Sequence, residues 1–356
     1  MSNHKKILIT GGAGFVGSSL AIKLKIQYPK NHIICLDNLK RRGSELNIDR
    51  LKHYGIEFLH GDIRNKEDIE SIRDINLILE CSAEPSVLAG YNSPEYLINT
   101  NLLGTINCLE LARKRKSDFI FLSTSRVYPF KTINSLNFTV AKTRFELKNK
   151  QDIIGVSAKG YTENFPLQGS RSLYGATKLA SELLIQEYQE MYNIRAVINR
   201  CGVITGPWQF GKIDQGFVVL WIAKHFWKQK LSYIGFGGEG KQVRDIVHID
   251  DLYNLINIQL KNIGKFNGEI FNVGGGKNIS VSLNELTSIC EKITGNKIKI
   301  SKIQDNRNAD IRIYLTDNTK VTKLTGWQPK ISITNIIEGI HNWIKNNEKQ
   351  LIKVLK

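Results

Sequence analysis

The chain has 356 residues, of which 41% are hydrophobic and 23% are charged, as is typical of globular proteins. This length allows about two domains and excludes a small disulfide-stabilised scaffold. The net charge of +17 would suit an anionic partner, but the basic residues form no stripe with interleaved aromatic residues, so we expect no nucleic-acid binding. The longest apolar run, residues 217–223, falls short of the roughly 18 residues that span a membrane, so we expect no membrane association. Five scattered cysteines without a CxxC motif favour free thiols in a reducing, cytoplasmic setting.

Short apolar runs alternate with amphipathic stretches over the first half of the chain. They predict strands at residues 6–10, 32–36, 56–60, 76–79, 118–122 and 196–199, with helices at 18–26 and 180–190. This alternation predicts an α/β fold with a doubly wound parallel Rossmann sheet. The alternation of strands and helices ends near residue 200. Beyond it, the sequence predicts helices at 250–260 and 333–346 and a strand at 270–273. We therefore expect a dinucleotide-binding domain over residues 1–200 and a smaller substrate-binding lobe over 201–356, with parts near 246–275 returning to the sheet.

A glycine-rich segment, residues 10–17, lies between the first predicted strand and the first helix. Its GxxGxxG spacing provides a tight turn and a close approach of the backbone to a pyrophosphate at the helix N-terminus. Asp37 follows the second strand, where a carboxylate binds the adenosine ribose hydroxyls and repels a 2′-phosphate. The sequence therefore favours NAD over NADP, although residues 40–42 are basic. Asp62, after the third strand, is equally suited to an adenine amine or to a helix N-cap.

Tyr174 and Lys178 lie one helical turn apart and therefore share a helix face. A nearby cation lowers the pKa of a phenol from its usual value near 10, so Tyr174 is a candidate general base. Residues 123–125, Ser-Thr-Ser, follow the fifth strand, where a hydroxyl can hydrogen-bond a substrate oxygen. A solvated Tyr–Lys pair is common on helices, and the interpretation as a catalytic pair depends on the upstream glycine motif.

Together TGGAGFVG, STSRVY and YGATK resemble the extended short-chain dehydrogenase/reductase family of nucleotide-sugar epimerases over nearly the whole chain. The resemblance implies a homo-oligomer, dimer or tetramer, formed through helices near residues 102–113 and 180–191. It implies catalysis by Thr124, Tyr174 and Lys178. Besides Tyr174 and Lys178, the residues implied to contact NAD are Gly11, Gly14, Phe15, Val16, Asp37, Asn38, Asp62, Ile63, Ser82, Ala83 and Asn101. The residues implied to bind a nucleotide-diphosphate sugar are Thr124, Gln215, Arg244, Arg307 and Asp310.

Four stretches, residues 37–43, 60–65, 214–216 and 240–245, resemble the subfamily of CDP-paratose 2-epimerases. This implies epimerisation at C2 of CDP-3,6-dideoxy-D-glucose to CDP-3,6-dideoxy-D-mannose, the CDP-tyvelose of lipopolysaccharide O-antigen biosynthesis. Three alternatives stay open: a UDP-hexose 4-epimerase, a nucleotide-sugar reductase or dehydrogenase, and an NAD-sensing protein without turnover.

The chain departs from the family pattern at a few positions. Glu80 stands where the family frequently has His, and we expect this change to affect only packing. Val203 replaces an Asn that many members use on the substrate. Ser125 and Arg126 stand where the family's 4,6-dehydratases carry an acid pair that expels water, so elimination is not expected.

Overall fold

The computed structural model describes residues 4–212 and 215–356, and the chain divides into two compact units. Unit 1 comprises the stretch to Val127, Leu173–Arg200 and Tyr253–Phe271. Unit 2 comprises Tyr128–Ser172, Cys201–Leu252 and Asn272–Lys356. No helix in the described ranges has the length and apolar character of a membrane span.

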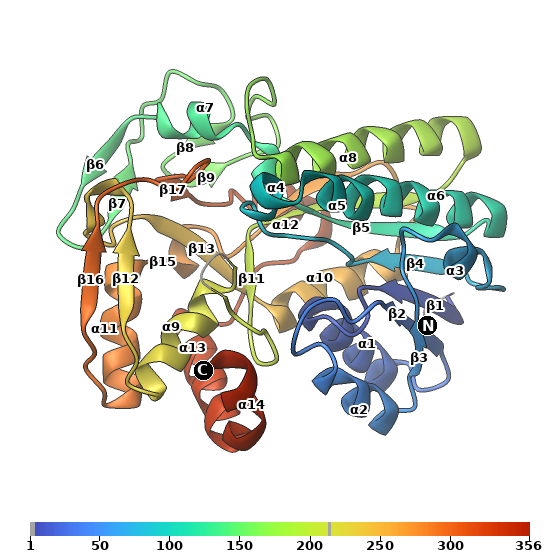
Figure 1. The fold of residues 1–356 in the computed structure, drawn as a ribbon. Helices are drawn as coiled ribbons and strands as arrows, with labels where there is room; N and C mark the ends of the chain where they lie inside the picture. The colour runs from blue at the N-terminus through green and yellow to red at the C-terminus, as the bar shows by residue number, and fades with distance from the viewer. Residues whose placement is uncertain (1–3, 213–214) are drawn as a thin grey trace. The chain divides into compact units, whose positions relative to one another are not determined.

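A seven-stranded sheet forms the centre of unit 1 and confirms the predicted doubly wound architecture (Figure 1). Its pairs β1–β2, β2–β3, β1–β4 and β4–β5 are parallel. The continuous apolar runs of the sequence become its buried central strands. In spatial order the strands are β14 (Ile270–Val273), β10 (Ala196–Cys201), β5 (Asp118–Thr124), β4 (Leu77–Glu80), β1 (Lys6–Thr10), β2 (His32–Asp37) and β3 (Glu57–His60).

Helices cover both faces of this sheet (Figure 1). On one face α3 (Lys66–Glu70), α6 (Gly104–Arg115) and α8 (Leu173–Tyr192) bury apolar side chains against the strands. The other face carries α1 (Phe15–Gln27), α2 (Leu46–His53) and α10 (Ile249–Lys261), and Tyr28 donates a hydrogen bond to Asn257 of α10. Helix α8 begins seven residues earlier than expected, so it contains both Tyr174 and Lys178. The helices α4 (Ala89–Asn92) and α5 (Pro94–Ile98) and a π-helical turn (Asn99–Leu103) precede α6.

Unit 2 contains small sheets and a cluster of helices. Strand β13 (Val243–His248) pairs with β11 (Val203–Thr205), β15 (Ser280–Ser282) and β17 (Ile313–Tyr314). The helices α9 (Phe217–Phe226), α11 (Leu283–Thr294) and α13 (Ile333–Asn346) pack on one another. The remaining elements are α7 (Phe130–Asn134), β6 (Phe138–Val140), β7 (Phe145–Leu147), β8 (Val156–Ser157), β9 (Gly160–Tyr161), β12 (Leu231–Ile234), β16 (Ile300–Ile303), α12 (Thr319–Thr325) and α14 (Glu348–Leu355).

Candidate active site

The glycine-rich segment forms a tight turn between β1 and α1. Gly11 has a φ of +64°, and its carbonyl accepts a hydrogen bond of 3.0 Å from the N–H of Gly14, which caps α1. A Cβ at Gly17 would lie only 2.2 Å from the carbonyl oxygen of Gly11, so a side chain is excluded there. Phe15 and Val16 are the first residues of α1. The turn therefore leads into the N-terminus of α1, where the first N–H groups, those of Phe15 and Val16, have no acceptor within the helix; this is the arrangement that binds a pyrophosphate.

Asp37 ends β2 and holds this turn. Its Oδ2 accepts hydrogen bonds from the N–H groups of Ala13 and Gly14, at 3.1 and 3.2 Å, and its Oδ1 accepts one of 2.8 Å from Leu39. Burial raises the pKa of Asp37, although the three backbone hydrogen bonds act to lower it. The carboxylate thus lies beside the helix N-terminus, as the dinucleotide-binding motif requires.

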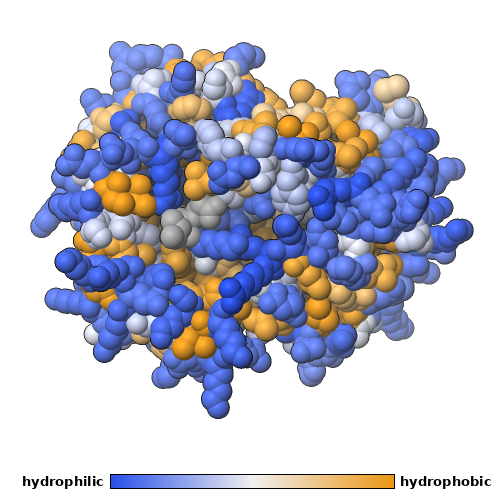
Figure 2. Space-filling view, viewed as in Figure 1, coloured by the Kyte–Doolittle hydropathy of each residue, from blue (hydrophilic) through white to orange (hydrophobic). Residues whose placement is uncertain are grey.

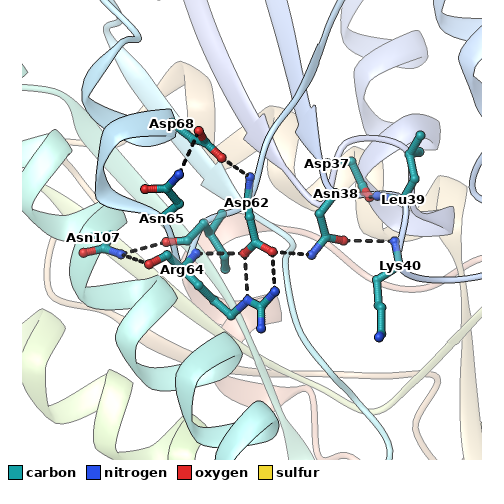
Figure 3. A network of polar contacts seen from close by, with 10 residues as sticks. Asp37, Asn38, Leu39, Lys40, Asp62, Arg64, Asn65, Asp68 and Asn107 are labelled. Carbon is teal, nitrogen blue, oxygen red and sulfur yellow. Dashed lines mark hydrogen bonds and ion pairs between the residues drawn. The ribbon is translucent and has the colours of Figure 1, made fainter.

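The predicted adenosine residues lie around a cleft of about 420 Å³ that is lined by Asn38, Lys40, His60, Gly61, Asp62, Arg64 and Asp68. In Figure 3 the side chains of Asn38 and Asp62 point toward each other, and Arg64 folds back onto Asp62. Asn38 donates to Asp62 Oδ2 at 2.8 Å, and Arg64 Nη2 donates to the same oxygen at 2.7 Å. Asp62 Oδ1 accepts from both the backbone N–H and Nε of Arg64, at 2.9 and 3.0 Å.

These bonds occupy the roughly four lone-pair directions of the Asp62 carboxylate. Burial acts to raise its pKa, but the hydrogen bonds from Arg64 and Asn38 outweigh burial and lower the pKa of Asp62 to about 2. An adenine amine can reach this carboxylate only if one of the four bonds opens. Within the Arg64–Asp62 ion pair, 37% of the Arg64 side chain is accessible to solvent, compared with 20% of the Asp62 side chain.

The loop after β4 approaches the glycine turn. A Cβ at Gly11 would lie 3.0 Å from Cα of Ser82, so Ser82 and the adjacent Ala83 lie close to the turn. Asn101 is fully buried, and its side chain exchanges two hydrogen bonds with the backbone of Glu84, at 2.8 and 3.0 Å. Asn101 therefore fixes the position of this loop. Ile63 is also buried, and its carbonyl accepts a 2.8 Å hydrogen bond from Asn107 of α6.

The three predicted catalytic residues belong to unit 1 and come from two packed elements. Thr124 is the last residue of the fully buried strand β5, and its hydroxyl accepts a hydrogen bond of 3.2 Å from the N–H of Arg126. Helix α8 packs against β5 and the turn that follows it, and carries Tyr174 and Lys178 with 8% and 2% of their surface exposed. The ammonium of Lys178 lies 4.1 Å from the centre of the Phe121 ring. A phenol and an ammonium are thus held one turn apart in a largely water-free environment.

Apart from Thr124, the predicted substrate residues belong to unit 2. The guanidinium of Arg244 donates to the carboxylate of Asp310 at 3.1 Å and to the carbonyl of Ile311 at 2.6 Å. The carbonyl of Arg307 accepts a 3.2 Å hydrogen bond from the N–H of Asp310, so the two residues belong to the same backbone turn. The structure therefore brings Arg244 and Asp310 together, and the backbone of Arg307 lies in the turn that ends at Asp310. Gln215 exchanges two backbone hydrogen bonds with Lys212, and Asp214 lies outside the described residues.

Sequence reasoning missed two charged residues of unit 1. Arg64 donates hydrogen bonds to both carboxylate oxygens of Asp62. A basic residue two positions after an acidic one was the sequence feature that could have indicated this pair. Glu80 lies at the end of β4 and is fully buried, with its Oε1 accepting a 2.7 Å hydrogen bond from Thr105. The loss of the family's usual His at this position was the only sign that its surroundings differ.

Comparisons with known proteins identify the family. The model of the "NAD dependent epimerase/dehydratase family" matches residues 7–274. The chain is 30% identical to CDP-paratose 2-epimerase of Salmonella typhi over 347 residues, which are 95% of this chain and 98% of that protein. It is 28% identical to UDP-glucuronate 4-epimerase of Thermodesulfobacterium geofontis over 361 residues, covering 98% of each chain.

Among solved structures, UDP-glucuronic acid 4-epimerase from Bacillus cereus, in complex with UDP-glucuronic acid and NAD, is similar with a TM-score of 0.78. The two sequences are 25% identical, and the alignment covers 96% of this chain and 99% of that one. The residues of unit 1 fit this cofactor, because the absence of side chains at Gly11 and Gly17 allows the tight turn at the start of α1 and Asp37 lies beside this turn. The chain belongs to the NAD-dependent epimerase/dehydratase family of nucleotide-sugar enzymes.

Proposed function

We propose that the protein is a CDP-paratose 2-epimerase that interconverts CDP-3,6-dideoxy-D-glucose and CDP-3,6-dideoxy-D-mannose. The observation that carries the proposal is the burial of Tyr174 and Lys178 on α8, packed against β5 where Thr124 ends the strand. This set suits reversible oxidation of a sugar hydroxyl. Without the phenol of Tyr174 the site would have no base to remove the proton of that hydroxyl.

The residues after Thr124 favour epimerisation over elimination. Loss of water from a sugar needs an acid that protonates the departing hydroxyl, and a dehydratase of this family has an acid pair directly after the threonine. Here those positions are Ser125 and Arg126, and neither is a proton donor of that kind near neutral pH. A 2-keto sugar formed in this site therefore keeps its remaining hydroxyls.

The catalytic residues have distinct roles in the proposed reaction. Tyr174, as phenolate, takes the proton of the sugar 2-hydroxyl, and it returns this proton when the ketone is reduced. Lys178 favours the phenolate through its positive charge and hydrogen-bonds the nicotinamide ribose. Thr124 donates a hydrogen bond to the sugar oxygen as it becomes a ketone. When bound, NAD supplies the group that accepts a hydride from C2 and gives it back on the opposite face of the sugar.

The diphosphate of the substrate is assigned to two arginines of unit 2. Arg244 and Arg307 carry planar guanidinium groups that match the oxygens of a phosphate. Asp310, which accepts from Arg244 at 3.1 Å, keeps that guanidinium oriented. Gln215 is assigned to the substrate from its place in the stretch that resembles the 2-epimerases.

Support for the CDP sugar and for C2 comes from the relative in Salmonella typhi and from the four similar stretches. A second candidate is a UDP-hexose 4-epimerase, which the relatives that act on UDP-glucuronate favour. The two candidates share the roles of Thr124, Tyr174 and Lys178 and differ in the nucleotide base and in the reacting carbon.

A homo-oligomer formed through the helices of unit 1 belongs to the proposal. Leu103, which precedes α6, and Leu183 and Met191 on α8 are apolar and are 42%, 56% and 64% exposed. Hydrophilic residues cover most of the face seen in Figure 2, and hydrophobic residues gather over the region of α5 and α8. An exposed apolar patch of this kind is typical of an interface between subunits.

A direct assay separates the candidates. The purified protein is incubated in turn with CDP-3,6-dideoxy-D-glucose, UDP-glucose and UDP-glucuronic acid, and the products are identified by NMR. The proposal expects the manno epimer from the CDP sugar and no product from the UDP sugars. Epimerisation of a UDP sugar at C4, without reaction of the CDP sugar, would identify a 4-epimerase. Thermal-shift measurements with CDP, UDP, GDP and dTDP test the base independently, since a ligand of the native state raises the midpoint.

A further inference from the structure

The side chain of Arg64 binds the same carboxylate that is assigned to the adenine base of NAD. Nη2 and Nε of Arg64 donate to the two oxygens of Asp62, at 2.7 and 3.0 Å. The backbone N–H of Arg64 and the amide of Asn38 donate to them as well, at 2.9 and 2.8 Å. Because four donors saturate a carboxylate, an adenine amine can bind Asp62 only in place of one of them.

The guanidinium of Arg64 is the donor that can leave most readily. The side chain of Asn38 is held at its other end, because its Oδ1 accepts a 3.0 Å hydrogen bond from the N–H of Lys40. The backbone of Arg64 is tied to α6, since Asn107 donates to its carbonyl at 3.3 Å and to the preceding carbonyl at 2.8 Å (Figure 3). The guanidinium, in contrast, reaches the carboxylate from a side chain that is 37% exposed.

Tyr96 of α5 is a second partner for this guanidinium. Cζ of Arg64 lies 4.9 Å from the centre of the Tyr96 ring, and Nζ of Lys40 lies 5.4 Å from the same centre. A cation over an aromatic ring at this distance is attracted to the ring whether or not a carboxylate is present. The ring can therefore hold Arg64 beside the cleft after the guanidinium has left Asp62.

We propose that Arg64 is a specificity-determining residue of the cofactor site, which competes with the adenine amine of NAD for Asp62 and so weakens the preference for adenine. The inference rests on the assignment of Asp62 to the adenine base. When NAD binds, the amine replaces the guanidinium as hydrogen-bond donor, so the free energy of the Arg64–Asp62 pair is subtracted from the affinity gained. A base without the amine leaves Arg64 on Asp62 and loses nothing by this competition.

A competition between two cofactors tests the proposal without any assay of activity. The purified protein is incubated at pH 7.5 with equal excesses of NAD and nicotinamide hypoxanthine dinucleotide, whose base has a carbonyl oxygen where adenine has the amine. Once the bound ratio no longer changes, the protein is separated from free nucleotides and denatured, and the released cofactors are measured by chromatography. The ratio of bound NAD to bound analogue reports the preference for the amine.

Arg64→Met keeps a long side chain over Tyr96 and removes the donors. We expect it to raise the ratio by about three- to tenfold, because Asp62 is still ionised at pH 7.5 and accepts the amine without first releasing a partner. An unchanged or lower ratio in Arg64→Met overturns the proposal. Should Arg64→Met fail to fold, Arg64→Lys decides, since it keeps the charge but loses the two-point contact. This variant should raise the ratio by a smaller factor, and a wild-type ratio would overturn the proposal.

Lys66→Met is the matched control, because it removes a positive charge two positions away from a side chain that is 67% exposed and pairs with Glu70. It should keep the wild-type ratio, and a rise equal to that of Arg64→Met would assign the effect to net charge and overturn the proposal. Asp62→Asn should lower the ratio, since its amide can donate to the carbonyl oxygen of the analogue. A wild-type ratio in Asp62→Asn would place adenine elsewhere and overturn the proposal. Because no nucleotide sugar is present, a failure of the CDP-sugar assignment does not affect these results.

Discussion

The hydroxyl of Ser123 donates a hydrogen bond to the carboxylate of Glu182, and this bond joins the end of β5 to α8. Arg200 of β10 binds the same carboxylate at 2.7 Å, and both charged side chains are at most 4% exposed. Ser123 directly precedes Thr124, and Glu182 lies about two helical turns after Tyr174. A buried ion pair thus fixes the two elements that carry the catalytic residues.

Glu182→Gln should lower the free energy of unfolding by about 3–5 kcal/mol, because it leaves the Arg200 charge buried without its counterion. The measurement is chemical denaturation followed by circular dichroism. Glu70→Gln, which removes an exposed acid paired with Lys114, serves as the control and should change the stability little. If both substitutions lowered the free energy of unfolding equally, the buried pair would contribute no more to stability than the exposed one.

Tyr174→Phe should lower kcat by about 10²- to 10⁴-fold, the range expected for loss of a general base. NAD should remain bound to the variant, since the ring stays and only the hydroxyl is removed. Chromatography of the supernatant after denaturation measures the bound cofactor. Tyr192→Phe is the control, because Tyr192 ends the same helix and is 44% exposed. A Tyr174→Phe enzyme within a few-fold of wild-type activity would remove the phenol from the mechanism.

The strands of unit 1 were predictable from sequence because each is a continuous apolar run between turn residues. The strand predicted at 118–122 ends two residues later, at Thr124. The start of α8 was missed, since residues 175–178, Gly-Ala-Thr-Lys, interrupt the apolar periodicity within the helix. Two relationships lay beyond sequence reasoning. Arg244 and Asp310 form an ion pair although 66 positions separate them in the chain, and the groups that interact with Glu80 come from two separate helices.

The stability of unit 2 should depend on pH through Asp245. This fully buried carboxylate accepts 3.0 Å hydrogen bonds from the N–H groups of Gly276 and Thr316, yet burial raises its pKa from 3.8 to about 6. A carboxyl whose pKa is higher in the folded state stabilises the fold below its unfolded pKa, and this stabilisation is lost as the pH rises through about 6.

The free energy of unfolding of the wild type, relative to Asp245→Asn, should therefore fall by about 2–3 kcal/mol between pH 4 and pH 7. Denaturant titrations at several pH values measure this difference. Asp305→Asn, which changes an exposed residue of unit 2, should parallel the wild type. A difference between wild type and Asp245→Asn that does not vary with pH would contradict the account.

Leu183→Asp should convert the proposed oligomer to monomers, because it places a charge on the exposed apolar surface of α8. Size-exclusion chromatography with light scattering measures the molar mass. Ile154→Asp is the matched control, since Ile154 is 74% exposed in unit 2 and should tolerate the charge. A monomeric wild type, or an oligomer that survives Leu183→Asp, would place the interface elsewhere.

Transfer of an isotopic label at C2 tests the central claim most directly. The substrate is CDP-3,6-dideoxy-D-glucose carrying deuterium at C2, and the reaction runs in ordinary water. Since the hydrogen removed from C2 is returned to the same carbon within one site, the epimerised product should keep its deuterium at C2, as seen by NMR and mass spectrometry. Substrate deuterated at C4 should show no primary isotope effect on turnover. Loss of the C2 label to solvent would indicate deprotonation at carbon, and a primary effect from the C4 label would assign the enzyme to the 4-epimerases.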